Sequence, residues 1–253
     1  MATYKKRSFK KNSSTYKQIG NDQGSSTANV FNTLDQSSST TQLFFEKNQI
    51  LIFSAVGTIA ILILGYLFYS TNFLAPEQKE AKNKMYFAQK KFDEAVLSNN
   101  DSIFNVVLNG DGTNLGMLNI IDEYSGTDAS NLAYYYAGMS YFNKNDYENS
   151  IKYLQEFDAK SSILGPIQTG TIGDSFSNLN QFEDAYDYYI KASNNKDIFT
   201  TPLYLFKAGQ IAINLGKFSD AEDFFKKIKI EYPNSNEAKN IDAFISMSKA
   251  LNN

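Results

Sequence analysis

The stretch YYYAGMSYFNKNDYENSIKYL, residues 134–154, decides how this chain folds, because its pattern returns twice further along the sequence. It places a small residue at Gly138, follows it with aromatic side chains, and then has a turn rich in asparagine at 143–145. The glycine recurs 35 positions later at Gly173, and 36 positions after that at Gly209. The pattern predicts three tandem repeats, each a pair of antiparallel helices.

Each recurring position has a physical reason. A small residue lets two helix backbones approach closely, and the aromatic side chains between the small positions fill the space around that contact. Asn145, Asn180 and Gly216 fall at the turn inside each pair, where Asn and Gly tolerate the left-handed backbone that ends a helix. We expect six small residues to pack the helices together: Gly138, Gly173, Gly209, Ser150, Ala185 and Ala221.

This pattern resembles the tetratricopeptide repeat, whose period is about 34 residues. The resemblance implies an all-α fold, a right-handed α-solenoid of antiparallel helix pairs, with clear repeats at about 131–162, 166–199 and 202–235. The positions that carry it are Gly138, Tyr141, Ser150 and Leu154, then Gly173, Phe176, Ala185 and Tyr189, then Gly209, Ala221, Phe225 and Pro233.

The segments on either side of these repeats are expected to extend the same fold. Residues 77–125 resemble a degenerate repeat that begins with an amphipathic helix at 80–97. Residues 99–116 are rich in Asn, Gly and Asp and are expected to form an insertion that bears a loop. Residues 236–250 are expected to form a capping helix that covers the open end of the solenoid.

An apolar run precedes the repeats. Residues 50–69 read ILIFSAVGTIAILILGYLFY, and 20 residues in a helix span the roughly 30 Å core of a bilayer. We therefore predict a transmembrane helix at 49–71. A cleaved signal peptide is disfavoured because residues 1–48 precede a run longer than signal peptides carry. A buried core helix is disfavoured because nothing nearby in the sequence could surround it.

The charges predict an orientation for this helix. Residues 1–48 hold seven Lys and Arg against three acids, which favours a cytoplasmic N-terminus and a domain at 76–253 on the opposite side. The Ser- and Asn-rich composition of 1–48 predicts a disordered basic tail. A weak apolar pattern at Ala28, Val30, Phe31 and Leu34 leaves open a short docking helix within it.

The composition argues against several classes of function. The chain has no Cys and no His, so it lacks a thiolate nucleophile, Cys-ligated metal and imidazole acid–base chemistry. After residue 48 the chain holds 17 bases against 24 acids, which argues against a nucleic-acid partner. Residues 109–114 resemble a calcium loop only superficially, because Asn114 occupies the glycine position. We predict no catalytic residue, metal or cofactor; a carboxylate-based hydrolase or an enzyme accessory is the alternative.

Binding of protein partners is the activity that the repeats predict. By analogy with the repeat family, the inner face of the first helices would form a groove that suits extended polypeptide, because Met and aromatic side chains re-pack around varied partners. The alternative for each residue is a place in the core. No Lys or Arg falls among them, so a clamp for a terminal carboxylate is not expected. The predicted residues are Tyr135, Met139, Phe142, Asp174, Ser177, Phe206, Gln210 and Ile213.

The whole layout resembles single-span bacterial membrane proteins of the ancillary SecYEG translocon subunit type. That resemblance implies an inner-membrane protein with a cytoplasmic N-terminus and a periplasmic domain. The domain would engage chains that emerge from the channel, or recruit periplasmic chaperones and peptidyl-prolyl isomerases. The alternative is a periplasmic scaffold for envelope assembly or cell division. Neither version predicts a nucleic acid or a small-molecule substrate as a partner.

Overall fold

The structure is a computed structural model that describes residues 26–159 and 163–252, with side chains from Lys47 onward. Within these residues every regular element is helical and no strand is present. The chain divides into two compact units, Met1–Tyr66 and Leu67–Asn253, which are described separately below. The all-α class predicted from the sequence is confirmed.

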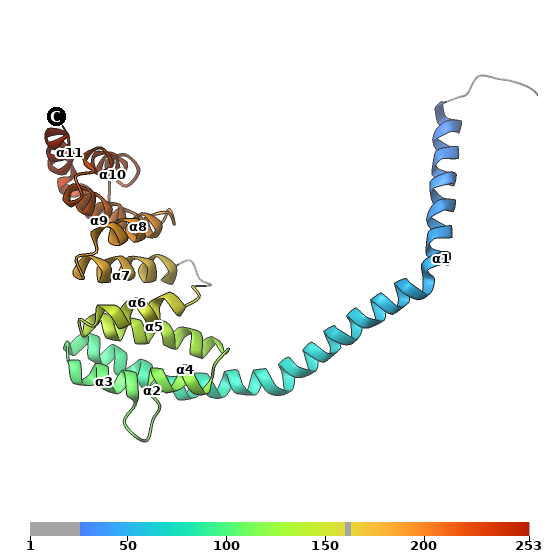
Figure 1. Cartoon of the computed structure of the whole chain (residues 1–253), viewed down its shortest axis with the longest axis horizontal. Helices are drawn as coiled ribbons and strands as arrows, with labels where there is room; N and C mark the ends of the chain where they lie inside the picture. The colour runs from blue at the N-terminus through green and yellow to red at the C-terminus, as the bar shows by residue number, and fades with distance from the viewer. Residues whose placement is uncertain (1–25, 160–162, 253) are drawn as a thin grey trace, which may run out of the picture. The chain divides into compact units, whose positions relative to one another are not determined.

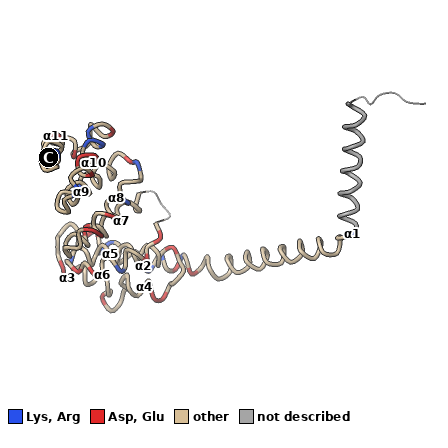
Figure 2. The backbone as a smooth tube through the Cα atoms, turned by 45° about the horizontal axis from the view of Figure 1, so that its top comes forward, with Lys and Arg blue, Asp and Glu red and all other residues tan. Residues whose placement is uncertain are grey.

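The first unit consists, where it is described, of the helix α1 (Ser26–Tyr69), whose last three residues belong to the second unit. Figure 2 shows no charged residue along its apolar part, and the charge-free stretch continues through 48–76. Large apolar side chains such as Ile50 and Leu62 are 87% and 67% exposed, so most of their surface is not covered by protein. Among the described residues this is the one helix long and apolar enough to cross a membrane.

The boundaries of α1 differ from those expected. The sequence predicted a disordered tail up to residue 48, whereas the structure begins the helix at Ser26; the rest of the tail lies outside the described residues. Extending an existing helix adds one hydrogen bond per residue without a new nucleation step, so polar residues can continue a helix that an apolar run has established. At its other end the α-helix stops at Tyr69, and the π-helix η1 (Ser70–Leu74) follows.

The degenerate region contains three helices where the sequence predicted a worn helix-pair repeat at 77–125, interrupted by a loop-bearing insertion at 99–116. They are α2 (Ala75–Ser98), α3 (Asp101–Asn109) and α4 (Met117–Glu123). The insertion prediction is wrong for α3, because Phe104, Val107 and Leu108 form a buried apolar face on that helix. The side chain of Asn100 starts it by accepting a hydrogen bond from the backbone N–H of Ser102 at 2.9 Å.

The repeats form a stack of helix pairs (Figure 1). Consecutive helices pack on one another, and the first helices of neighbouring pairs also make contact, which is the packing of an α-solenoid. The final helix packs against the last pair, at the place predicted for a cap. The elements are α5 (Asp128–Asn143) and α6 (Tyr147–Glu156), α7 (Leu164–Asn178) and α8 (Phe182–Ser193), α9 (Thr200–Asn214) and α10 (Phe218–Glu231), then the 3-10 helix η2 (Glu237–Asn240) and α11 (Ile241–Leu251).

The turn inside each pair has the same geometry in all three repeats. Asn145, Asn180 and Gly216 take positive φ angles of 60°, 60° and 75°, the left-handed backbone expected there from the sequence. In each case the next residue donates its backbone N–H to the carbonyl five positions earlier, at 2.8–2.9 Å. This shared turn sets the angle at which each second helix folds back on its first helix.

The small residues lie where neighbouring helices meet. All six are buried. A β-carbon added at Gly138 would come within 2.5 Å of Leu154, one at Gly173 within 2.9 Å of Tyr189, and one at Gly209 within 2.5 Å of Phe225. In each pair the first helix therefore rests directly on a large side chain of the second helix.

The second unit is expected to fold without the apolar helix. A fragment covering 76–253 keeps the helices that line the core and removes exposed apolar side chains such as Tyr69 and Phe73. We expect it to be soluble without detergent and to unfold in one cooperative transition, measured by the helical circular dichroism signal during urea titration. A fragment that aggregates, or that gives a strand-type spectrum, would contradict this division of the chain.

Candidate protein-binding surface

The eight side chains predicted to bind protein lie on the first helices α5, α7 and α9. None of them is buried: Gln210 is exposed and the other seven are half-buried. On each helix they recur at intervals of three or four residues, so they share one face. Because α5 contacts α7 and α7 contacts α9, the three faces are neighbours. We call these eight side chains together the first-helix surface.

At the α5 end of this surface, aromatic side chains pack against one another at its edge. The Tyr135 ring lies 5.3 Å from that of Phe157 and 5.7 Å from that of Tyr136, measured between centroids. The Phe142 ring lies 5.8 Å from that of Tyr147. These contacts fix the rings while leaving part of each exposed, so a partner meets apolar area that is already ordered.

At the α9 end the predicted residues divide into two groups. The Phe206 ring packs 4.9 Å from that of Phe244 on α11 and 5.8 Å from that of Phe225 on α10, between centroids. Much of the Phe206 side chain therefore packs in the core. A core position was the alternative that the sequence left open for each of the eight residues. Ile213 also packs in part against this core, whereas Gln210 is exposed and remains available on the surface.

A cluster of polar and aromatic groups occupies the middle of the surface. The Asp174 carboxylate accepts two hydrogen bonds from the Lys207 ammonium, at 2.6 and 2.8 Å, and one from the Tyr189 hydroxyl at 2.7 Å. The same ammonium lies 5.7 Å from the centroid of the Tyr189 ring and 5.8 Å from that of Tyr204. Lys207 and Asp174 thus neutralise each other and link α7 to α9.

Sequence reasoning missed Lys207. It had assigned no base to this surface, because it took the same positions from every repeat, and Lys207 stands one position after one of them. A signal was present in the sequence. Asp174 and Lys207 are 33 residues apart, which is close to one repeat period, so the spacing predicts that these opposite charges lie on neighbouring first helices.

The hydroxyls of this cluster should make the domain sensitive to alkali. Burial, with the negative charge of Asp174, raises the pKa values of Tyr189 and Tyr204 above the ordinary tyrosine value of about 10. Above that pH the unfolded chain releases protons that the folded domain keeps, so the free energy of unfolding falls as pH rises, by up to about 1.4 kcal/mol per pH unit for each group.

Urea titrations between pH 8 and pH 11 measure this slope. We expect Tyr189→Phe and Tyr204→Phe each to reduce the loss of stability per pH unit, whatever they do to stability at neutral pH. A slope that is unchanged in both variants would show that these hydroxyls ionise as readily in the folded domain as in the unfolded chain.

The described residues offer no grouping of three or more His, Cys, Asp or Glu that could hold a metal ion. Asp111, in the segment that superficially resembles a calcium loop, closes a turn: its carboxylate accepts the backbone N–H groups of Asn114 at 2.7 Å and Thr113 at 3.0 Å. These hydrogen bonds, with Asn114 the main cause, lower the pKa of Asp111.

A comparison with protein families identifies two of the three helix pairs. The model described as the tetratricopeptide repeat matches residues 132–160 and 204–235, which hold most of the first pair and of the third. The chain contains tetratricopeptide repeats. The pair α7 and α8 lies between the two matches and has the same turn geometry. No curated protein matches the chain.

These repeats place the second unit in a broad functional class. Tetratricopeptide repeats are protein–protein interaction modules and are generally non-catalytic, since their stacked helices offer a broad surface instead of an enclosed catalytic pocket. The first-helix surface, with its ordered aromatic edge and its neutralised centre, fits that class.

Proposed function

We propose that this chain is a non-catalytic, membrane-anchored interaction module whose first-helix surface binds polypeptide. The observation that carries the proposal is that none of the eight residues on the three neighbouring first helices is buried, although most of them are apolar. The centre of the surface is a closed ion pair of Asp174 with Lys207, so a partner meets little net charge there. Such a surface suits extended or unfolded apolar segments.

The more specific role is that of an accessory to the bacterial protein-translocation channel. The layout supports it: a basic N-terminal segment, one long apolar helix among the described residues, and tetratricopeptide repeats further along the chain. In this role the N-terminus is cytoplasmic, the apolar helix crosses the inner membrane and the repeats stand in the periplasm. They meet emerging chains or recruit a periplasmic chaperone or isomerase.

The topology can be tested directly, because the natural chain has no cysteine. A single cysteine is introduced either by Ser14→Cys in the tail or by Lys227→Cys, an exposed position on α10. We expect a membrane-impermeant maleimide to label the Lys227→Cys chain in intact spheroplasts, and the Ser14→Cys chain only after lysis. The opposite pattern would place the repeats in the cytoplasm and overturn the translocon role.

The partner is tested by crosslinking from the proposed surface. A photo-crosslinking amino acid replaces Met139 or Gln210 in the full chain, and Asp187, exposed on the second helix α8, is the matched control. We expect crosslinks to the SecYEG channel, a membrane-tethered isomerase or an emerging chain from the first two positions only. Crosslinks to envelope-assembly or division proteins would favour the scaffold alternative. Equal crosslinking from Asp187 would mean that the first-helix surface is not the binding site.

A further inference from the structure

Two large apolar side chains stand almost uncovered at the start of α9. Ile198 is 70% exposed and Phe199 is 79% exposed, whereas most aromatic side chains of the helix pairs are at least half-buried. Adjacent apolar side chains left in water on a folded domain mark contact sites more often than single scattered ones do. Neither residue belongs to the first-helix surface.

The segment that carries them is held firmly. The Asp197 carboxylate accepts the backbone N–H groups of Phe199 at 2.8 Å and Thr200 at 2.6 Å, and it also pairs with the Thr200 hydroxyl. The backbone N–H of Asp197 donates to the Thr201 hydroxyl at 3.1 Å. Ile198 and Phe199 therefore lie on an ordered helix start. Binding of a partner costs little conformational entropy in this segment, because its backbone is already fixed.

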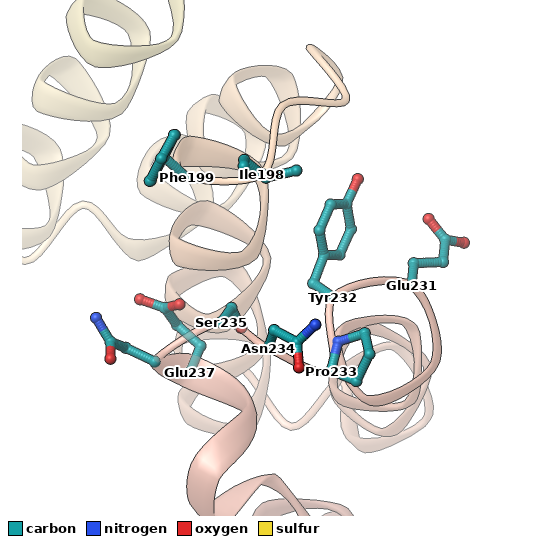
Figure 3. Close-up of a pocket in the computed structure, with 9 residues that line it drawn as sticks. Ile198, Phe199, Glu231, Tyr232, Pro233, Asn234, Ser235 and Glu237 are labelled. Carbon is teal, nitrogen blue, oxygen red and sulfur yellow. The ribbon is translucent and has the colours of Figure 1, made fainter.

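These two side chains form one wall of a pocket of about 360 Å³. Figure 3 shows Ile198 and Phe199 on one side, and the segment that follows α10 on the other, with the Tyr232 ring and Pro233 near Glu231. The remaining lining residues are polar and come from the same segment: Asn234, Ser235, Asn236 and Glu237. The pocket joins an apolar wall to a polar one, and it lies between a connection before a first helix and a connection after a second helix.

The charge of the pocket has one sign. Glu231 and Glu237 line it, and none of its nine lining residues is basic. Neither carboxylate has a hydrogen bond or an ion pair with any side chain that the structure describes. Figure 3 shows these carboxylates on opposite sides of the pocket, Glu231 beside Tyr232 and Glu237 on the side of Phe199, so each offers a cationic group a carboxylate that has no competing partner.

We propose that this pocket is a second protein-docking site, which takes a partner segment with a Lys or Arg next to an aromatic or large aliphatic residue. The apolar side chain of the segment packs on Ile198 and Phe199, and its cation pairs with one of the two carboxylates, Glu237 or Glu231. An anionic membrane surface is a poorer occupant, because the same two carboxylates are repelled by it. This site shares no residue with the first-helix surface, so it does not depend on the function proposed above.

The test is a fluorescence anisotropy titration of the full chain in detergent micelles with a labelled peptide, acetyl-Gly-Lys-Phe-Arg-Gly-amide. We expect binding that weakens with added salt and that is lost when Glu replaces both basic residues of the peptide. The double variant Glu231→Gln with Glu237→Gln should lower the affinity at least about five-fold, the scale of one partly exposed ion pair. Phe199→Ser should lower it by a similar factor, since it removes the apolar wall.

Controls separate this site from its alternatives. Asp187→Asn, at an exposed carboxylate of α8 that does not line the pocket, should leave the peptide affinity unchanged, and every variant should keep the helical circular dichroism of the natural chain, because the altered side chains are partly or fully exposed. Equal affinity for the acidic peptide, or full affinity in the glutamine double variant, would overturn the proposal. Self-association of the chain that Phe199→Ser abolishes, without any peptide binding, would also overturn it, since the occupant would then be a second copy.

Discussion

Replacing Gly170 by valine is expected to destabilise the repeat domain by about 3 kcal/mol, the upper part of the usual range for overpacking. Gly170 is buried on α7, and a β-carbon built there would lie less than 3.0 Å from three atoms of the Tyr204 ring and hydroxyl. That ring has little room to retreat: Tyr204 is 4% exposed and stacks on Tyr189 with a centroid distance of 6.3 Å. Valine therefore has to push α7 and α9 apart.

Urea unfolding of the 76–253 fragment, followed by circular dichroism, measures this effect. The matched control is Gly165→Ala on the same helix, where a β-carbon would meet only the Ala159 side chain at 3.4 Å. That change should be neutral or stabilising by up to about 1 kcal/mol, because alanine favours helix more than glycine does. Similar midpoints for the two variants would mean that α7 and α9 are not packed as closely as described.

Gly170 also shows what a repeat pattern can and cannot predict. Gly138, Gly173 and Gly209 recur, so the sequence alone marked them as packing positions, and Asn145 and Gly216 recur as turn residues. Gly170 occurs in one repeat only, because the residue that needs the space is Tyr204 in the next repeat. Contacts between repeats depend on pairs of positions that a comparison of repeats, position by position, does not reveal.

The same reason accounts for what was missed in the candidate sites. Lys207 pairs with Asp174 in the preceding repeat, so it does not stand out within its own unit. Ile198 and Phe199 follow the polar run Asn194–Asp197, which reads as an ordinary connection. Their role becomes visible only when Tyr232 and Pro233, one repeat period of 34 residues further on, are placed beside them.

The helix α3 was not predicted for a different reason, because the apolar spacing of a helix is present in its own sequence. Ile103, Val107 and Leu108, with Phe104 between them, have the three- and four-residue spacing of an amphipathic helix. The surrounding Asn, Gly and Asp residues outweighed that pattern when the segment was judged by composition. Composition describes an average over a window, whereas burial depends on which face each residue occupies, so a short helix between polar flanks is easily lost.

Replacing Phe104 by alanine tests whether α3 belongs to the core, and it should cost about 3–5 kcal/mol of unfolding free energy. Phe104 is fully buried, and its ring meets that of Phe92 on α2 edge-on, with a centroid distance of 6.0 Å. Truncation leaves a cavity between α3 and α2 that the neighbouring helices cannot close without losing their own contacts. The measurement is again urea unfolding of the 76–253 fragment.

Leu97→Ala is the matched control, because Leu97 is a large apolar residue of the same region that is 88% exposed. Its loss should change the unfolding free energy by less than about 0.5 kcal/mol. If Phe104→Ala costs no more than this control, residues 101–109 are a surface insertion, as their composition suggested. If it costs the expected amount, α2, α3 and α4 together cap the end of the solenoid that faces away from α11. The degenerate region is then a structural part of the domain although its repeat pattern is weak.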